Sequence, residues 1–169
     1  MAIFDRQGEL TSRGRRWCMA FLGLYVLILV LLCWTPQPFQ IDGVKTPNVF
    51  RVGQMVFLLV PFNSFVAFGE LGSFKEIIWV VGQNLTNIFL IYPLVLGLLS
   101  SFPKIRNIST VLLISFAISL TIESGQLALD LLIDANRVFE IDDLWTNTLG
   151  GYLAYVTYIL LTKRIKSLD

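Results

Sequence analysis

The side chains best suited to chemistry are concentrated in the segment from Glu123 to Gly151. Glu123, Gln126 and Asp130 are spaced three and four residues apart, so on a helix they share one face. Asp134 extends that face if the helix continues. Apolar residues surround these positions, and a carboxylate in such a setting is costly unless it faces a bundle interior or water. The spacing therefore predicts a polar face that is turned toward other helices.

Two roles are open for this polar face. Glu123 and Gln126 either form a structural hydrogen-bond clasp between helices or line a pocket that binds a ligand. For Arg137, the alternatives are an ion pair with Glu140 or Asp142 and a bidentate clamp on an anion. The candidate ligand-binding residues are Asn63, Asn84, Asn87, Gln126, Arg137 and Asn147.

Acid–base catalysis is a further alternative, with Glu123 and Asp143 as the candidate catalytic pair. No recognisable nucleophile motif accompanies them. The chain has no histidine, which removes imidazole catalysis and the usual zinc sites. Asp142 and Asp143 are weak candidates for a magnesium or calcium ion, so we expect neither a metal nor a cofactor.

The composition indicates which elements must position these residues. The 169 residues are 55% hydrophobic and 15% charged, with a mean hydropathy of +0.70. A soluble domain has about 45–50% apolar and about 25% charged residues, so we predict an integral membrane protein with lipid as its neighbour. The formal net charge of +1 argues against a nucleic-acid partner.

The hydrophobic runs predict an all-α, polytopic membrane helical bundle. Residues 54–68 extend only about 22 Å as a helix, short of a hydrocarbon core of about 30 Å, and contain Pro61 near the middle. We therefore expect four full spans plus one broken or re-entrant segment, with five spans as the alternative. The four expected spans are Trp17–Trp34, Ile77–Leu99, Ile108–Asp130 and Trp145–Leu161.

The distribution of basic residues supports the four-span topology. That topology predicts cytoplasmic termini, at residues 1–16 and in a basic tail at 162–169, and an extracytoplasmic polar face. It places most of the 13 lysines and arginines in the cytoplasm, whereas five spans would remove the bias. The cytoplasmic set is Arg6, Arg13, Arg15, Arg16, Lys104, Arg106, Lys163, Arg164 and Lys166.

The polar segment resembles the signature of the VanZ-like membrane proteins. The resemblance lies in an E-x-x-Q pair at Glu123, a downstream Arg137, a D-D-L-x-x-N run at Asp142 and a glycine pair at Gly150. Upstream, the Pro61-Phe62-Asn63 segment is also similar. Val95 departs from the pattern, because a glycine is expected there; Gly97 is the substitute.

The resemblance implies a single VanZ-like transmembrane domain at residues 17–161 of a protein in the bacterial inner membrane. It also implies a link to resistance against teicoplanin-type glycopeptide antibiotics. We expect an outward pocket that binds an anionic lipid-linked envelope precursor, a lipid headgroup or the antibiotic. The alternatives are an enzyme acting on a lipid or lipid phosphate and a small transporter; the sequence does not indicate an oligomeric state.

Overall fold

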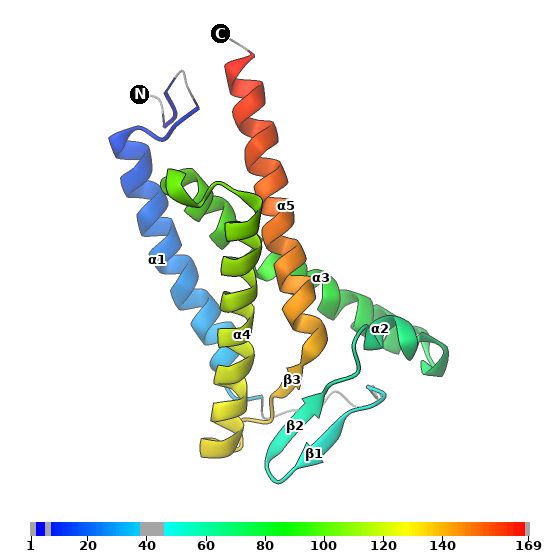
Figure 1. The fold of residues 1–169 in the computed structure, drawn as a ribbon. Helices are drawn as coiled ribbons and strands as arrows, with labels where there is room; N and C mark the ends of the chain where they lie inside the picture. Colours follow the sequence, from blue (N-terminus) through cyan, green and yellow to red (C-terminus); the bar gives the residue numbers. More distant parts are fainter. Residues whose placement is uncertain (1–2, 6–7, 38–45, 168–169) are drawn as a thin grey trace.

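The computed structural model describes residues 3–5, 8–37 and 46–167. Helices dominate this part of the chain, as predicted (Figure 1). Both termini lie at one end of the bundle, and a small β-sheet lies at the other. The long helices are α1 (Ser12–Trp34), α3 (Phe74–Ser101), α4 (Ile108–Ile133) and α5 (Ile141–Lys166).

Side-chain caps determine where three of the long helices begin. The Thr11 hydroxyl accepts the Gly14 N–H at the start of α1, and the Asn107 side chain accepts the Thr110 N–H at the start of α4. At α3, Ser73 and Glu76 form a reciprocal capping box. Each cap satisfies a backbone donor that the first helical turn leaves without a partner.

Gly150 and Gly151 bring α5 into close contact with α3 and α4. A Cβ atom at Gly150 would collide with the carbonyl oxygen of Ile88 in α3, and one at Gly151 would collide with the Ser115 hydroxyl in α4. The missing side chains therefore allow two helices to approach α5 at the same level. The glycine pair therefore has a packing role in the bundle.

Gly97 allows a similar contact between α1 and α3. A Cβ atom there would lie 2.7 Å from Leu22 Cδ2. Val95, where the family pattern led us to expect glycine, is only 2% exposed and belongs to the core between α3 and α5. Gly97 therefore faces α1, whereas Val95 faces α4 and α5, so the two residues serve different contacts.

A three-stranded sheet corrects the strictly all-α prediction. Strands β1 (Phe50–Val52) and β2 (Met55–Leu58) form an antiparallel hairpin, and β2 pairs in parallel with β3 (Val138–Glu140). Gly53 has a φ of +63° in the hairpin turn, a conformation that glycine adopts without strain. The strands are short and lie inside segments that otherwise look like loops, which is why periodicity did not reveal them.

Residues 54–68 do not form a membrane-spanning helix. They contain β2, the Pro61 turn and the four-residue helix α2 (Asn63–Val66), followed by the short helix η1 (Phe68–Glu70). The five-span alternative is therefore wrong. The position of this segment at membrane depth stays a prediction.

Three helices of the described chain are long and apolar enough to span a membrane: α1, α3 and α4. The predicted count of four full spans is therefore not confirmed. Helix α5 is long enough, but its first half contains the buried polar residues Asp142, Thr146 and Asn147. These side chains face the other helices, so the polarity of α5 reflects its central position in the bundle.

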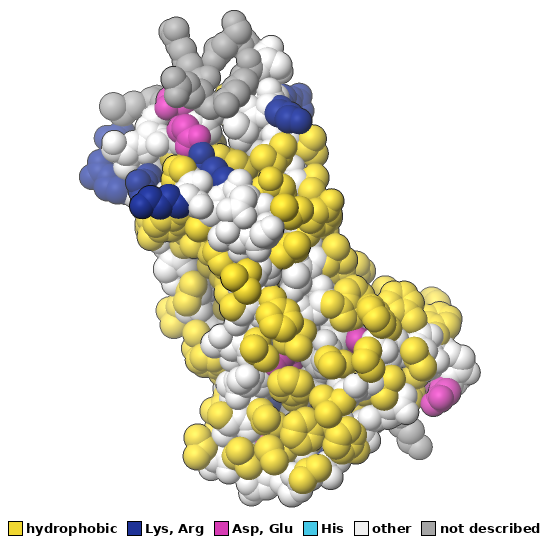
Figure 2. Space-filling model, in the orientation of Figure 1, with side chains coloured by type: hydrophobic (Ala, Val, Ile, Leu, Met, Phe, Trp, Pro, Cys, Tyr) yellow, Lys and Arg dark blue, Asp and Glu magenta, His cyan; other side chains and the backbone are white. Residues whose placement is uncertain are grey.

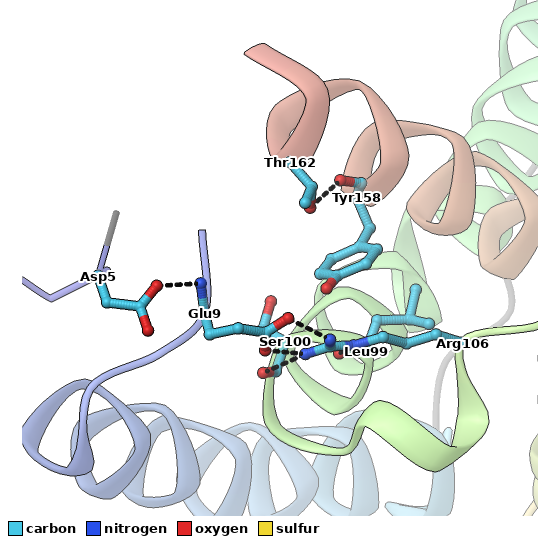
Figure 3. Close-up of polar contacts among 7 residues, drawn as sticks. All are labelled: Asp5, Glu9, Leu99, Ser100, Arg106, Tyr158 and Thr162. Atoms are coloured by element: carbon cyan, nitrogen blue, oxygen red, sulfur yellow. Dashed lines mark hydrogen bonds and ion pairs between the residues drawn. The ribbon is translucent and has the colours of Figure 1, made fainter. Parts of the chain in front are cut away.

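Arg106 follows the short helix η2 (Pro103–Ile105) and binds the N-terminal segment to the end of the bundle. Its guanidinium makes a bidentate ion pair with Glu9, at 2.5 and 2.6 Å, and lies 4.9 Å from the centre of the Tyr158 ring (Figure 3). It also donates to the carbonyls of Leu99 and Ser100. One side chain thus joins the N-terminal segment, α3 and α5.

The surface separates basic and apolar residues along the bundle. On the face shown in Figure 2, most lysine and arginine side chains gather at the end with the termini, and hydrophobic side chains cover much of the remainder. Acidic side chains also show at the end with the termini, beside the basic ones, and elsewhere only in small patches. Arg6 and Lys45, which the topology argument used, lie outside the described residues.

We predict that Gly150→Ala destabilises the protein by about 1–3 kcal/mol or more, because the new methyl group forces α5 away from α3. Thermal unfolding in detergent measures this. Gly23→Ala is the matched control, since a Cβ atom at Gly23 meets nothing within 4 Å. Equal unfolding temperatures for the two variants would contradict the packing role of Gly150.

Candidate functional site

The predicted polar residues meet in a groove at the sheet end of the bundle. The groove has a volume of about 680 Å³, within the range of about 300–1,000 Å³ that is usual for small-molecule sites. Its lining comes from the end of α1, the first half of α3, the second half of α4, the segment 137–140 and the start of α5. The predicted residues in the lining are Asn87, Glu123, Gln126, Arg137, Asp143 and Asn147.

Glu123 and Asp143 form a carboxyl pair on the groove floor. Glu123 is 1% exposed, and its Oε2 accepts the backbone N–H of Glu140 at 3.0 Å. Asp143 Oδ1 accepts from Asn87 Nδ2 at 2.5 Å. Both carboxyl groups line the groove, so the floor presents their oxygens to a ligand.

Asn147 is held by a chain of hydrogen bonds through Ser119. The Ser119 hydroxyl donates to the carbonyl oxygen of Asp143 and accepts from Asn147 Nδ2, both at 3.0 Å. Since the hydroxyl has only one proton, this chain fixes which end of the Asn147 amide carries the donors. Asn147 Oδ1 is buried and has no hydrogen-bond partner among the described residues.

Gln126 and Arg137 both bind the carboxyl end of α1. Gln126 Nε2 donates to the Cys33 carbonyl at 3.1 Å. Arg137 Nε donates to the Thr35 carbonyl, and its Nη2 donates to the carbonyls of Leu32 and Thr35. These carbonyls lack partners within α1 and carry the negative end of its dipole. Neither predicted ion pair of Arg137, with Glu140 or Asp142, forms.

Asp142 positions the turn before α2 instead of contributing to the groove. Its Oδ1 accepts the N–H groups of Phe62, at 2.6 Å, and of the Trp145 indole, at 3.0 Å. Its Oδ2 accepts the Ser64 N–H at 3.4 Å. With both oxygens used by protein donors, Asp142 fits a structural role better than a metal site. The described residues contain no group of three acidic or cysteine side chains arranged to hold a metal ion.

Asn63 and Asn84 line a separate, small polar cavity of about 20 Å³. Asn63 is 4% exposed and bonds to Asn48 and to the Pro47 carbonyl. Asn84 Nδ2 donates to Ser64 Oγ at 2.7 Å. This volume suits a single water molecule, so the structure does not bring these two predicted residues into the larger groove.

Glu140 connects the two spaces, and sequence reasoning missed it as a lining residue. Burial, together with the nearby charges of Asp143 and Asp142, raises the pKa of Glu140 to about 8. It is therefore mostly protonated at neutral pH. Strand β3 sets its position, because the β2 register pairs Glu140 with Leu58, and a parallel pairing of this kind leaves no signal in the local sequence.

The shared helical face of α4 is confirmed up to Asp130. Asp130 is 1% exposed, and its Oδ1 accepts the Arg137 backbone N–H at 2.9 Å. Asp134 does not continue the face, because α4 ends at Ile133 and Asp134 caps it with a φ of +52°. Asp134 is exposed to solvent and lies outside the site.

The comparisons with known proteins support the same region. The protein-family model described as VanZ/LLP1 matches residues 22–162, which include every residue of the groove floor. No curated protein and no solved structure matches the chain.

We predict that Asp142→Asn destabilises the protein by about 1–3 kcal/mol, since one carboxylate acceptor becomes an amide that faces N–H donors. Faster hydrogen exchange at the Phe62 and Ser64 amides would show the turn loosening. Asp134→Asn is the matched control, because this residue is exposed and asparagine tolerates its left-handed φ. Unchanged exchange at both amides would contradict the positioning role.

Proposed function

Because the chain belongs to the VanZ/LLP1 family, we propose that it is a glycopeptide-resistance-associated membrane protein that binds an amphiphile in its groove. The bound part is the polar head of an anionic lipid-linked envelope precursor, of a membrane lipid or of a glycopeptide antibiotic. The remainder of the ligand is apolar and extends along the walls of the groove.

The combination of a polar floor with apolar walls carries this proposal. The floor holds the carboxyl pair of Glu123 and Asp143, whereas Ile78, Trp79 and Leu90 contribute apolar wall. A soluble polar metabolite would leave these walls in contact with water or lipid, and a purely apolar molecule would leave the carboxyl oxygens without donors. An amphiphile provides donors for the carboxyl oxygens of the floor and covers the apolar walls.

Arg137 provides the contact for an anionic group on the ligand. Its Nη1 has no hydrogen-bond partner among the described residues, while its Nε and Nη2 are used by α1. The bond to α1 holds the guanidinium in place at the groove. A phosphate or carboxylate of the ligand then meets a charged donor that is already oriented.

We propose that the groove faces the outside of the bacterial inner membrane and that both termini are cytoplasmic. The excess of lysine and arginine at the end with the termini supports this orientation (Figure 2). The groove is at the opposite end, close to the sheet. A precursor or antibiotic on the outer face would reach it without crossing the membrane.

We predict that Gly82→Phe lowers ligand binding at least about tenfold by filling the groove. Gly82 lines the groove, and a Cβ atom there meets nothing within 4 Å, so the phenyl ring enters open space and the fold is retained. Growth of a susceptible bacterium on teicoplanin, with and without the expressed protein, measures resistance; photo-crosslinking of a lipid-linked precursor measures binding.

Gly23→Phe is the control for this experiment. Gly23 is exposed on α1, away from the groove, and also has open space around it. The control should retain the activity of the unmodified protein. If Gly82→Phe retains both resistance and crosslinking at equal expression, the groove is not the binding site.

For the orientation, we predict that cysteines at Ser73 and Asp134 react with an impermeant maleimide added to intact cells. Both positions are exposed at the sheet end. Lys163→Cys should react only after permeabilisation. The background carries Cys18→Ala and Cys33→Ala, since both native cysteines are free thiols. Labelling of position 163 in intact cells would reverse the proposed orientation.

A further inference from the structure

We infer that the groove floor recognises an ammonium group, so that the ligand is an amphiphile with a positively charged, hydrogen-bond-donating head. This inference rests on the proposed function and specifies the chemical class of the ligand. The ammonium belongs to an amine-bearing lipid headgroup or to the free amine of an acylated antibiotic. Both sources offer the same chemistry to the protein.

The first observation is an excess of acceptors on the floor. Asn147 Oδ1 is buried and lacks a donor among the described residues, although Asn147 itself is only 1% exposed. Its orientation is fixed, because the Ser119 proton is already given to the Asp143 carbonyl. A buried amide oxygen without a donor is costly, and a ligand N–H group at this position removes the cost.

The second observation is that two carboxyl groups, Glu123 and Asp143, line the same groove as Asn147. The neighbouring donors, Asn87 Nδ2 and the Glu140 N–H, are neutral and bind one oxygen of each carboxyl group. A cation with several N–H groups provides donors for the remaining carboxyl oxygens and for the Asn147 oxygen.

Three other charged or titratable groups line the groove: Arg137, Glu140 and Lys75. The Arg137 guanidinium donates to the carbonyls at the end of α1, where it offsets the helix dipole. Glu140 is mostly protonated at neutral pH and adds little charge of its own. Lys75 lines the groove from the first turn of α3.

The anionic part of the ligand has a separate position in the same groove. Arg137 Nη1 is available for a phosphate, as the proposed function requires, while the carboxyl pair takes the ammonium. A zwitterionic head that carries phosphate and primary ammonium therefore has a partner for each charge. A head with phosphate alone places its charge near the pair and leaves Asn147 Oδ1 without a donor.

Competition between lipids that differ only in the amine tests this inference. The delipidated protein in detergent is incubated with equal amounts of phosphatidylethanolamine, phosphatidylcholine and phosphatidylglycerol of identical acyl chains, and native mass spectrometry counts the bound lipids. We expect phosphatidylethanolamine to exceed phosphatidylcholine about tenfold, the effect of one charge-assisted hydrogen bond. Phosphatidylcholine has the same net charge but no N–H group.

Variants locate the preference in the groove. The double variant Glu123→Gln, Asp143→Asn keeps the side-chain sizes and removes the charge, so the preference for phosphatidylethanolamine should disappear. The matched control is Glu70→Gln, Asp134→Asn, which neutralises two exposed carboxylates and should retain the preference. Gly82→Phe, which places a phenyl ring in the groove, should also abolish it.

The outcomes separate this inference from the proposed function. Groove-dependent binding of phosphatidylglycerol or phosphatidylcholine at or above the level of phosphatidylethanolamine overturns the ammonium site but keeps the amphiphile site. Lipid binding that Gly82→Phe does not change overturns both. If the preference is found, displacement of phosphatidylethanolamine by an amine-bearing acyl glycopeptide, but not by its N-acetylated form, identifies the antibiotic as the source of the ammonium.

Discussion

Carboxyl groups buried in an apolar bundle require hydrogen-bond donors. This requirement determines how the segments at the sheet end of this protein are arranged. Glu123, Asp142 and Asp143 each accept a hydrogen bond from another element. The donors are the backbone of β3, the turn before α2 and the amide of Asn87 in α3. Polar atoms that cost free energy when isolated thus connect segments that lie far apart in the sequence.

Close helix packing makes these connections possible. Gly150 and Gly151 let α5 approach α3 and α4 together, about two turns beyond the polar start of α5. The contact sets the distance of Asp143 from Asn87 on one side and from Glu123 on the other. If α5 were displaced by one methyl group at this level, short hydrogen bonds such as that of 2.5 Å between Asn87 and Asp143 would lengthen.

The sequence predicted the components of the site better than their partners. Helical spacing placed Glu123, Gln126 and Asp130 on one buried face, because side chains three and four residues apart must align. It did not predict that Arg137 binds the end of α1, since that contact joins residues about a hundred positions apart. The β-sheet was missed for a similar reason: the parallel pairing of β2 with β3 is non-local and involves very short strands.

Structural and binding roles are difficult to separate from the sequence, because the polar side chains that line the groove also join the helices. Arg137 caps α1, and the bond to α1 orients the remaining N–H groups that we propose as donors for an anion. Asn147 is likewise held by Ser119, and this same bond leaves its carbonyl oxygen open. The hydrogen-bond clasp and the proposed pocket are therefore one structure. The bonds between helices fix the side chains that line the groove. The same two carboxyl groups would serve proton transfer in an enzyme, whereas the proposed ammonium site needs only their acceptor oxygens and that of Asn147.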